Sequence, residues 1–137
     1  MKKVLVLCTG NSCRSQMAHG YLKHFGKGEL EVYSAGVETH GVNPIAVGVM
    51  NEDGIDITKN TSNHIDEYMD IEFDLVLTVC DSAKESCPYF PSTAKMIHHS
   101  FQDPAYAKGT ANEVIANFRE VRDEIKMYCE GLVKETK

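Results

Sequence analysis

The chain has 137 residues, 42% hydrophobic and 25% charged, which is typical of a single soluble domain spanning residues 1–137. Its formal net charge of −6 argues against a surface that binds nucleic acid or anionic membranes. No apolar run approaches the roughly 20 residues of a membrane span, and the short run after Lys3 has no signal-peptide cleavage site. We therefore expect a cytoplasmic protein, whose five cysteines are catalytic, redox-active or metal-linked rather than structural disulfides.

Apolar runs and one alternating segment (30–34) predict strands. Apolar residues at helical spacing predict two helices, and Asn43 as an N-cap before Pro44 predicts a third, which Gly54 ends. In chain order we expect a strand at 2–7, a helix at 15–25, a strand at 30–34, a helix at 44–52, strands at 73–79 and 94–98, and a helix at 112–134. Strands that alternate with helices indicate an α/β fold, a doubly wound four-stranded parallel sheet flanked by helices. Ligands bind such sheets at the carboxyl ends of the strands, so Cys8, Cys80 and Asp103 should meet at one edge.

The segment Cys8-Thr-Gly-Asn-Ser-Cys-Arg-Ser15 joins the first predicted strand to the first predicted helix. A short loop rich in Gly, Asn and Ser can turn its backbone N–H groups toward one centre, and the helix dipole adds positive potential there. We predict that a tetrahedral oxyanion binds in this loop and that the planar guanidinium of Arg14 holds two of its oxygens. Cys8 is then expected to be a nucleophilic thiolate near neutral pH. The predicted oxyanion-binding residues are Thr9, Gly10, Asn11, Ser12, Cys13 and Arg14.

Ser15 and Asp103 complete the predicted catalytic set around Cys8. The Ser15 hydroxyl can hydrogen-bond the thiolate, although a serine at this place also suits a helix N-cap. Asp103, before Pro104, can give a proton to the leaving oxygen, although Asp-Pro by itself is a turn signal. Cys13 suits simple packing, and an off-pathway disulfide with Cys8 is the alternative.

Cys80 and Cys87 lie seven residues apart after the third predicted strand. A loop of this size can bring two thiols together as a disulfide or hold them apart. A zinc site made of this pair with His98 and His99 would be poorly spaced, so we predict no metal. A redox pair and two buried, inert cysteines both remain open at this point.

The chain resembles the thioredoxin-coupled arsenate reductases, which share the fold of the low-molecular-weight protein tyrosine phosphatases. The resemblance runs from Lys3 to about Lys126. Its clearest segments are Cys8-Thr-Gly-Asn-Ser-Cys-Arg-Ser-Gln-Met-Ala18, Tyr33-Ser-Ala-Gly36, Thr39-His-Gly-Val-Asn-Pro44, the Cys80 and Cys87-Pro pair, Asp103-Pro-Ala105 and Phe118-Arg-Glu-Val-Arg-Asp-Glu-Ile125.

This resemblance implies a three-cysteine relay that reduces arsenate. Cys8 attacks arsenate, Cys80 attacks Cys8 as arsenite leaves, and Cys87 attacks Cys80 to leave a Cys80–Cys87 disulfide for thioredoxin. The implied catalytic residues are Cys8, Arg14, Ser15, Cys80, Cys87 and Asp103. Thioredoxin is the external reductant, no cofactor is implied, and the enzyme is expected to be a monomer. Some relatives bind potassium through two acidic residues, but His19 and Asn63 stand at those places here, so no cation site is expected.

Two other functions compete with this hypothesis. A phosphotyrosine phosphatase would use Cys8, Arg14 and Asp103 alone, since hydrolysis needs neither Cys80 nor Cys87. A redox or anion-sensing module without enzymatic activity is the third alternative.

Overall fold

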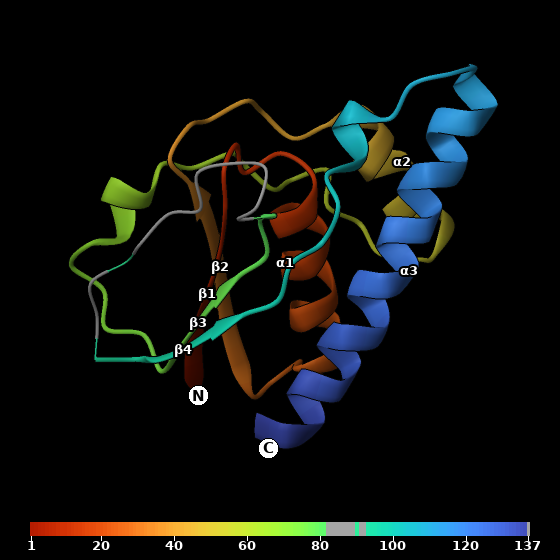
Figure 1. Cartoon of the computed structure of the whole chain (residues 1–137). Coiled ribbons are helices and arrows are strands. Elements are labelled where there is room, and N and C mark those ends of the chain that lie inside the picture. The colour runs from red at the N-terminus through yellow and green to blue at the C-terminus, as the bar shows by residue number, and fades with distance from the viewer. Residues whose placement is uncertain (82–89, 91–92, 137) are drawn as a thin grey trace.

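The structure, a computed structural model, describes residues 1–81, 90 and 93–136. Its centre is a four-stranded parallel sheet in the order β2-β1-β3-β4 (Figure 1). The strands are β1 (Lys2–Cys8), β2 (Leu30–Gly36), β3 (Leu75–Thr78) and β4 (Lys95–His98). The predicted α/β fold with four parallel strands is therefore confirmed. The chain order of the strands reverses between β1 and β3, the kind of position at which doubly wound sheets bind ligands.

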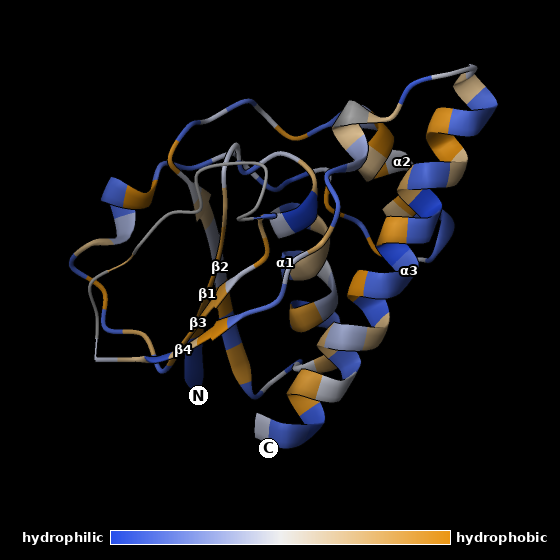
Figure 2. Ribbon diagram, in the orientation of Figure 1, coloured by the Kyte–Doolittle hydropathy of each residue, from blue (hydrophilic) through white to orange (hydrophobic). Residues whose placement is uncertain are grey.

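The described α-helices pack on one face of the sheet (Figure 1). They are α1 (Arg14–Phe25), α2 (Pro44–Glu52) and α3 (Ala111–Thr136). Val4 and Val6 of β1 share a buried cluster with residues of all three helices, because alternate side chains of a strand face the same side. Apolar and polar residues alternate along α3 at helical spacing (Figure 2), so its apolar stripe faces this cluster.

The other face of the sheet has its own core. Leu5 and Leu7 of β1 pack there with Phe73 and Phe90. A short 3-10 helix, η1 (Ile65–Tyr68), covers the same face. Hydrophobic residues on both faces of β1 explain why the strand is apolar without interruption.

The predicted element boundaries agree with the structure to within two residues, but two 3-10 helices were missed. η1 begins with a capping box, in which His64 Nδ1 accepts from Asp66 N–H and the Glu67 carboxylate accepts from His64 N–H. η2 (Pro104–Tyr106) follows Asp103, whose carboxylate caps it. An acceptor residue followed by Pro is also how α2 begins, so the signal for η2 was present in the sequence.

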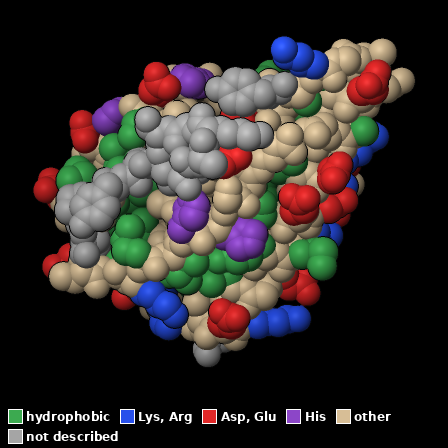
Figure 3. Space-filling model, in the orientation of Figure 1, with side chains coloured by type: hydrophobic (Ala, Val, Ile, Leu, Met, Phe, Trp, Pro, Cys, Tyr) green, Lys and Arg blue, Asp and Glu red, His purple; other side chains and the backbone are tan. Residues whose placement is uncertain are grey.

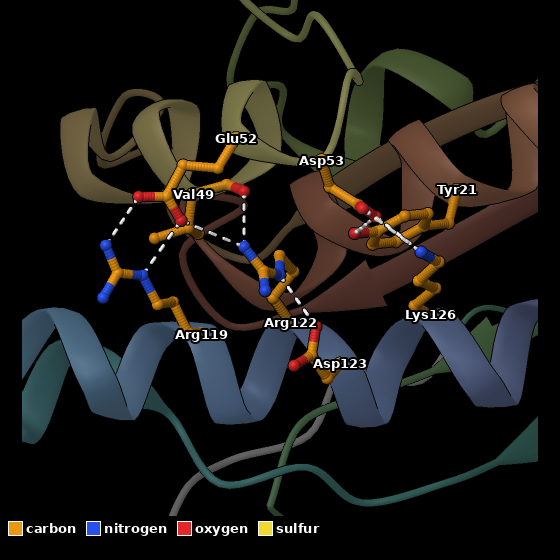
Figure 4. A network of polar contacts seen from close by, with 8 residues as sticks. All are labelled: Tyr21, Val49, Glu52, Asp53, Arg119, Arg122, Asp123 and Lys126. Carbon is orange, nitrogen blue, oxygen red and sulfur yellow. Dashed lines mark hydrogen bonds and ion pairs between the residues drawn. The ribbon is translucent and has the colours of Figure 1, made fainter.

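Polar contacts hold α2 against α3 and α1 (Figure 4). The hydroxyl of Tyr21, a buried α1 residue, donates to Asp53 Oδ2 over 2.7 Å, and Lys126 Nζ of α3 lies 2.9 Å from the same oxygen. The hydrogen bonds from Lys126 and Tyr21 hold the pKa of Asp53 below its usual value. Glu52 makes ion pairs with Arg119 and Arg122 of α3. By fixing α2, these contacts also help to hold residues 38–43, which precede α2 and hydrogen-bond to the loop after β1.

Acidic side chains are scattered over the face of the molecule seen in Figure 3, in keeping with the net charge of −6. Asp and Glu side chains are spread along the side of the molecule where α3 lies. Within the described residues, no helix is both long and apolar enough to span a bilayer. Because the net charge is negative, an oxyanion can bind this protein only where hydrogen-bond donors are concentrated locally. Such a concentration lies at the end of β1.

Candidate active site

A pocket of about 210 Å³ opens at the carboxyl end of β1. It is lined by Cys8, Thr9, Gly10, Ser12, Cys13, Arg14, Glu38, His40, Asp103 and Ala105. Pockets for drug-sized ligands measure about 300–1,000 Å³, so this one suits a small ion. Most of the predicted oxyanion-binding residues line it, together with Cys8 and Asp103. Asn11, Ser15 and Cys80 are buried behind it instead.

We call residues 8–13, the loop that leads from β1 into α1, the cradle. Four successive carbonyl groups of the cradle accept hydrogen bonds from outside it: Thr9 O from Glu38 N–H (3.0 Å), Gly10 O from His40 N–H (3.1 Å), Asn11 O from Gln16 Nε2 (3.0 Å) and Ser12 O from Asn43 N–H (3.2 Å). In a trans peptide the C=O and the following N–H point in opposite directions. Because the carbonyls face outward, the N–H groups of residues 10–13 turn the other way.

Those four amides are unused donors. Within the described part of the chain, the N–H groups of Gly10, Asn11, Ser12 and Cys13 donate to no other group. Buried backbone N–H groups almost always have an acceptor, and convergent amides at a helix N-terminus bind anions. The cradle is therefore built to receive the oxygens of an anion.

Cys8 is hydrogen-bonded to Ser15, with 3.1 Å between Sγ and Oγ. Asn11 Nδ2 donates to the same Oγ over 2.8 Å. Because Asn11 occupies an acceptor position on the hydroxyl, the single O–H of Ser15 is available to a thiolate at Cys8. Ser15 is the second residue of α1 and the N-cap is Cys13, so the alternative role of Ser15 as an N-cap is wrong.

The side chain of Asn11 turns away from the pocket. Asn11 has a positive φ of 48°, a conformation that asparagine tolerates better than most residues. Its Oδ1 accepts from Asn63 N–H over 2.7 Å, in addition to its contact with Ser15. The sequence placed Asn11 among the anion ligands. The structure shows that its backbone belongs to the cradle, whereas its side chain holds the loop in shape.

Arg14 and Asp103 come together across 89 positions of the sequence. Arg14 Nη2 lies 3.3 Å from Asp103 Oδ2, and Nη1 donates to Phe101 O over 3.2 Å. Arg14 is almost fully buried, with 3% of its side chain exposed. Asp103 Oδ1 also accepts from Ala105 N–H. These contacts hold a carboxylate at the edge of the cradle, where it can exchange a proton with a bound group.

The cysteines fall into two chemical classes. Cys8, Cys13 and Cys129 are free thiols, whereas Cys80 is disulfide-bonded. Cys80 follows β3 and lies in the same buried cluster as Cys8 and Cys13. Cys87, its predicted partner, lies outside the described residues.

Cys13 and Cys129 are poor nucleophiles. Burial, followed by the nearby Asp103 carboxylate, raises the pKa of Cys13 to about 12. Burial alone raises the pKa of Cys129 to about 12. Both remain protonated thiols near neutral pH, which favours the packing interpretation of Cys13 over an off-pathway disulfide.

Glu38 and His40 are pocket residues that the sequence analysis did not single out. A Cβ on Gly10 would lie 2.5 Å from His40 Nδ1, so the imidazole lies directly against the cradle. His40 Nε2 lies 3.3 Å from Glu38 Oε2. The only sequence signal for this side of the pocket is the family resemblance of the segment Thr39-His-Gly-Val-Asn-Pro44, which contains His40.

No group of three or more His, Cys, Asp or Glu side chains among the described residues could hold a metal ion. The zinc alternative cannot be assembled from these residues, because its member Cys87 lies outside them. His19, where the sequence analysis expected no cation site, places its Nδ1 2.8 Å from Ser34 Oγ. Burial, followed by Lys23, lowers the pKa of His19 to about 4, so this imidazole is neutral.

The comparisons with known proteins agree with this geometry. The family model for low molecular weight phosphotyrosine protein phosphatase matches residues 3–137. The chain belongs to this family. A relative from Halalkalibacterium halodurans named arsenate reductase is 53% identical over 124 residues, covering 90% of this chain and 89% of the relative.

Two solved structures extend the comparison of this phosphatase-family member. An arsenate reductase in the phosphate-binding state has a TM-score of 0.84, 34% identity and complete coverage of both chains. An arsenate reductase in an oxidized state also has a TM-score of 0.84, with 32% identity and complete coverage of both chains. The predicted resemblance to arsenate reductases with the low-molecular-weight phosphatase fold is confirmed.

Proposed function

We propose that this protein reduces arsenate to arsenite by a relay of Cys8, Cys80 and Cys87, and that thioredoxin regenerates it. The observation that carries this proposal is the disulfide-bonded Cys80 beside a free Cys8 in one buried cluster. A phosphatase needs neither Cys80 nor Cys87, so a second sulfur in a disulfide at this edge of the sheet favours reduction. The arsenate reductase relatives described above support the same activity.

The first step takes place at the cradle. The four inward amides and Arg14 bind three oxygens of arsenate, and the Cys8 thiolate, stabilised by Ser15, forms a bond to arsenic. The fourth oxygen, which is the hydroxyl of monohydrogen arsenate, takes a second proton from Asp103 and leaves as water, so that Asp103 ends the step as a carboxylate.

The second and third steps move electrons through sulfur. The Cys80 thiolate attacks Cys8 Sγ, the sulfur–arsenic bond breaks, and its electron pair remains on arsenic, which leaves as arsenite. The Cys87 thiolate then attacks Cys80 Sγ, and Cys8 departs as a thiolate. Two electrons from thioredoxin reduce the resulting Cys80–Cys87 disulfide. This scheme uses no cofactor and needs only one copy of the chain. Its thiols suit the reducing conditions of the cytoplasm.

The test is arsenite production with thioredoxin, thioredoxin reductase and NADPH, compared with hydrolysis of p-nitrophenyl phosphate by the same sample. Cys80→Ser should retain hydrolysis and stall before arsenite release. Cys87→Ser should release arsenite once and then hold a Cys8–Cys80 disulfide, which peptide mass mapping detects. Cys8→Ser should lose both activities, because a hydroxyl is a much weaker nucleophile. Sustained arsenate reduction by both Cys80→Ser and Cys87→Ser would rule out the relay.

A phosphatase is the second candidate. The family match, and a pocket in which Cys8, Arg14 and Asp103 meet, favour it. Under this alternative, wild-type protein hydrolyses p-nitrophenyl phosphate at a steady rate and releases no arsenite with thioredoxin.

A further inference from the structure

Gln16 is a completely buried polar residue behind the cradle, and it does not line the pocket. It lies in the first turn of α1. Its Nε2 donates to Asn11 O and to Thr61 O, over 3.0 Å in each case. Its Oε1 accepts from Asn60 Nδ2 over 3.1 Å. Gln16 thus links the middle of the cradle to the loop at 60–61.

The peptide that Gln16 holds joins Asn11 to Ser12, and its direction decides whether an N–H or a carbonyl oxygen faces the centre of the cradle. A peptide between two residues can flip by rotating one dihedral on each side, as the difference between type I and type II turns shows. For the Asn11–Ser12 peptide these two dihedrals are ψ of Asn11 and φ of Ser12. A flip of the Asn11–Ser12 peptide would replace the Ser12 N–H in the cradle with the Asn11 carbonyl oxygen, which repels an anion.

We infer that Gln16 is a positioning residue that locks the Asn11–Ser12 peptide with its N–H toward the bound oxyanion. With the Nε2 donor present, the outward Asn11 carbonyl is satisfied in a buried place. Without the Nε2 donor, the buried Asn11 carbonyl oxygen has no partner in the outward conformation, and that conformation is destabilised. The fraction of molecules with a competent cradle then falls, and the apparent anion affinity falls with it. This inference rests on the oxyanion site of the proposed function, but it needs only anion binding and no arsenate reduction.

The experiment measures inorganic phosphate binding by titration calorimetry on the full chain. Gln16→Met removes both Nε2 donations without adding charge. Gln16→Glu keeps the shape and, at a pH where its carboxyl is ionised, has no donor. Both should weaken phosphate binding on the order of 10- to 100-fold. Asn60→Ala is the matched control, since it removes the hydrogen bond that Gln16 accepts and leaves both bonds that Nε2 donates, and its loss of affinity should be smaller than that of either Gln16 variant.

An NMR titration separates positioning from a merely structural role. Phosphate should move the amide resonance of Ser12 in the wild-type protein, and the movement should be reduced in Gln16→Glu. A wild-type Ser12 amide that does not respond to phosphate overturns the inference even if a variant fails to fold. Phosphate affinity within about twofold of wild type in a folded Gln16 variant also overturns it, whatever the change in melting temperature, because an unpaired acceptor predicts a larger effect. Arsenate reduction enters none of these measurements, so a failure of the proposed function leaves their outcome unaffected.

Discussion

Gly36→Ala should disrupt the cradle through one added methyl group. Gly36 ends β2 and pairs with Cys8 of β1. A Cβ at this position would lie 2.5 Å from Thr9 O, 2.9 Å from Asn11 N and 2.9 Å from Cys8 O. All three neighbours are backbone atoms of the cradle, so no side chain can rotate away to make room.

The expected cost follows from this geometry. Overpacking a rigid site typically lowers the free energy of unfolding by about 1–3 kcal/mol. Because the neighbours here are backbone atoms, which cannot rotate away, we expect a loss of about 3 kcal/mol. At about 2.1 cal/mol/K per residue, a chain of 137 residues has an unfolding entropy of about 0.29 kcal/mol/K. The melting temperature should therefore fall by about 10 °C. Phosphate binding should weaken as well, because the displaced atoms belong to the site.

Thermal unfolding followed by circular dichroism, together with phosphate titration, checks both effects. The control is Gly48→Ala in α2, where an added Cβ meets nothing within 4 Å. Alanine lowers the entropy of the unfolded chain, so this control should gain about 0.4–1 kcal/mol. A Gly36→Ala protein that melts with wild type and binds phosphate equally well would refute the steric reasoning.

The other predictions test the site and its charges. Arg14→Lys should lose most phosphate affinity in calorimetry, because an ammonium cannot make two parallel hydrogen bonds to an oxyanion; an unchanged affinity would contradict the clamp. Asp103→Asn should still bind phosphate but form the Cys8 adduct roughly 10²–10⁴-fold more slowly in rapid-quench experiments, and an unchanged adduct rate would exclude the acid role. Iodoacetamide at pH 8 should label Cys8 and spare Cys13, whose pKa of about 12 keeps it a thiol; equal labelling in peptide mapping would be inconsistent with this. The pKa of His19 is lowered from 6.5 to about 4, so the unfolded chain binds the extra proton and stability should fall, by up to about 3 kcal/mol, as the pH falls from 7 to 4. Urea unfolding should show a smaller fall for His19→Gln, and an identical pH dependence would disprove the assignment.

The cradle could be located from the sequence because its signals are local. An apolar strand, a Gly- and Asn-containing loop and an amphipathic helix follow one another within 25 residues. The strand and helix boundaries were close for the same reason, since periodicity and caps act over a few residues. The resemblance added the roles of Cys80 and Cys87, which spacing alone left open.

The groups that hold the cradle in shape could not be read from the sequence. Gln16, Asn63 and His40 each contact the cradle from a different element, and none has a local pattern that marks it. The side-chain direction of Asn11 was also unpredictable, because it depends on a hydrogen bond to a residue 52 positions away.

By itself, the sequence determined the order of strands and helices, the place of the cradle and the presence of a cysteine, an arginine and an aspartate suited to oxyanion chemistry. Those properties depend on neighbouring residues and on side-chain type. The sequence also predicted that Cys8, Cys80 and Asp103 meet at one edge of the sheet. Only the tertiary structure decided which atoms meet there: Arg14 pairs with Asp103, and four cradle carbonyls face outward. These contacts join segments that are distant along the chain, and they form only when the packing of the whole sheet brings the strand ends to one edge.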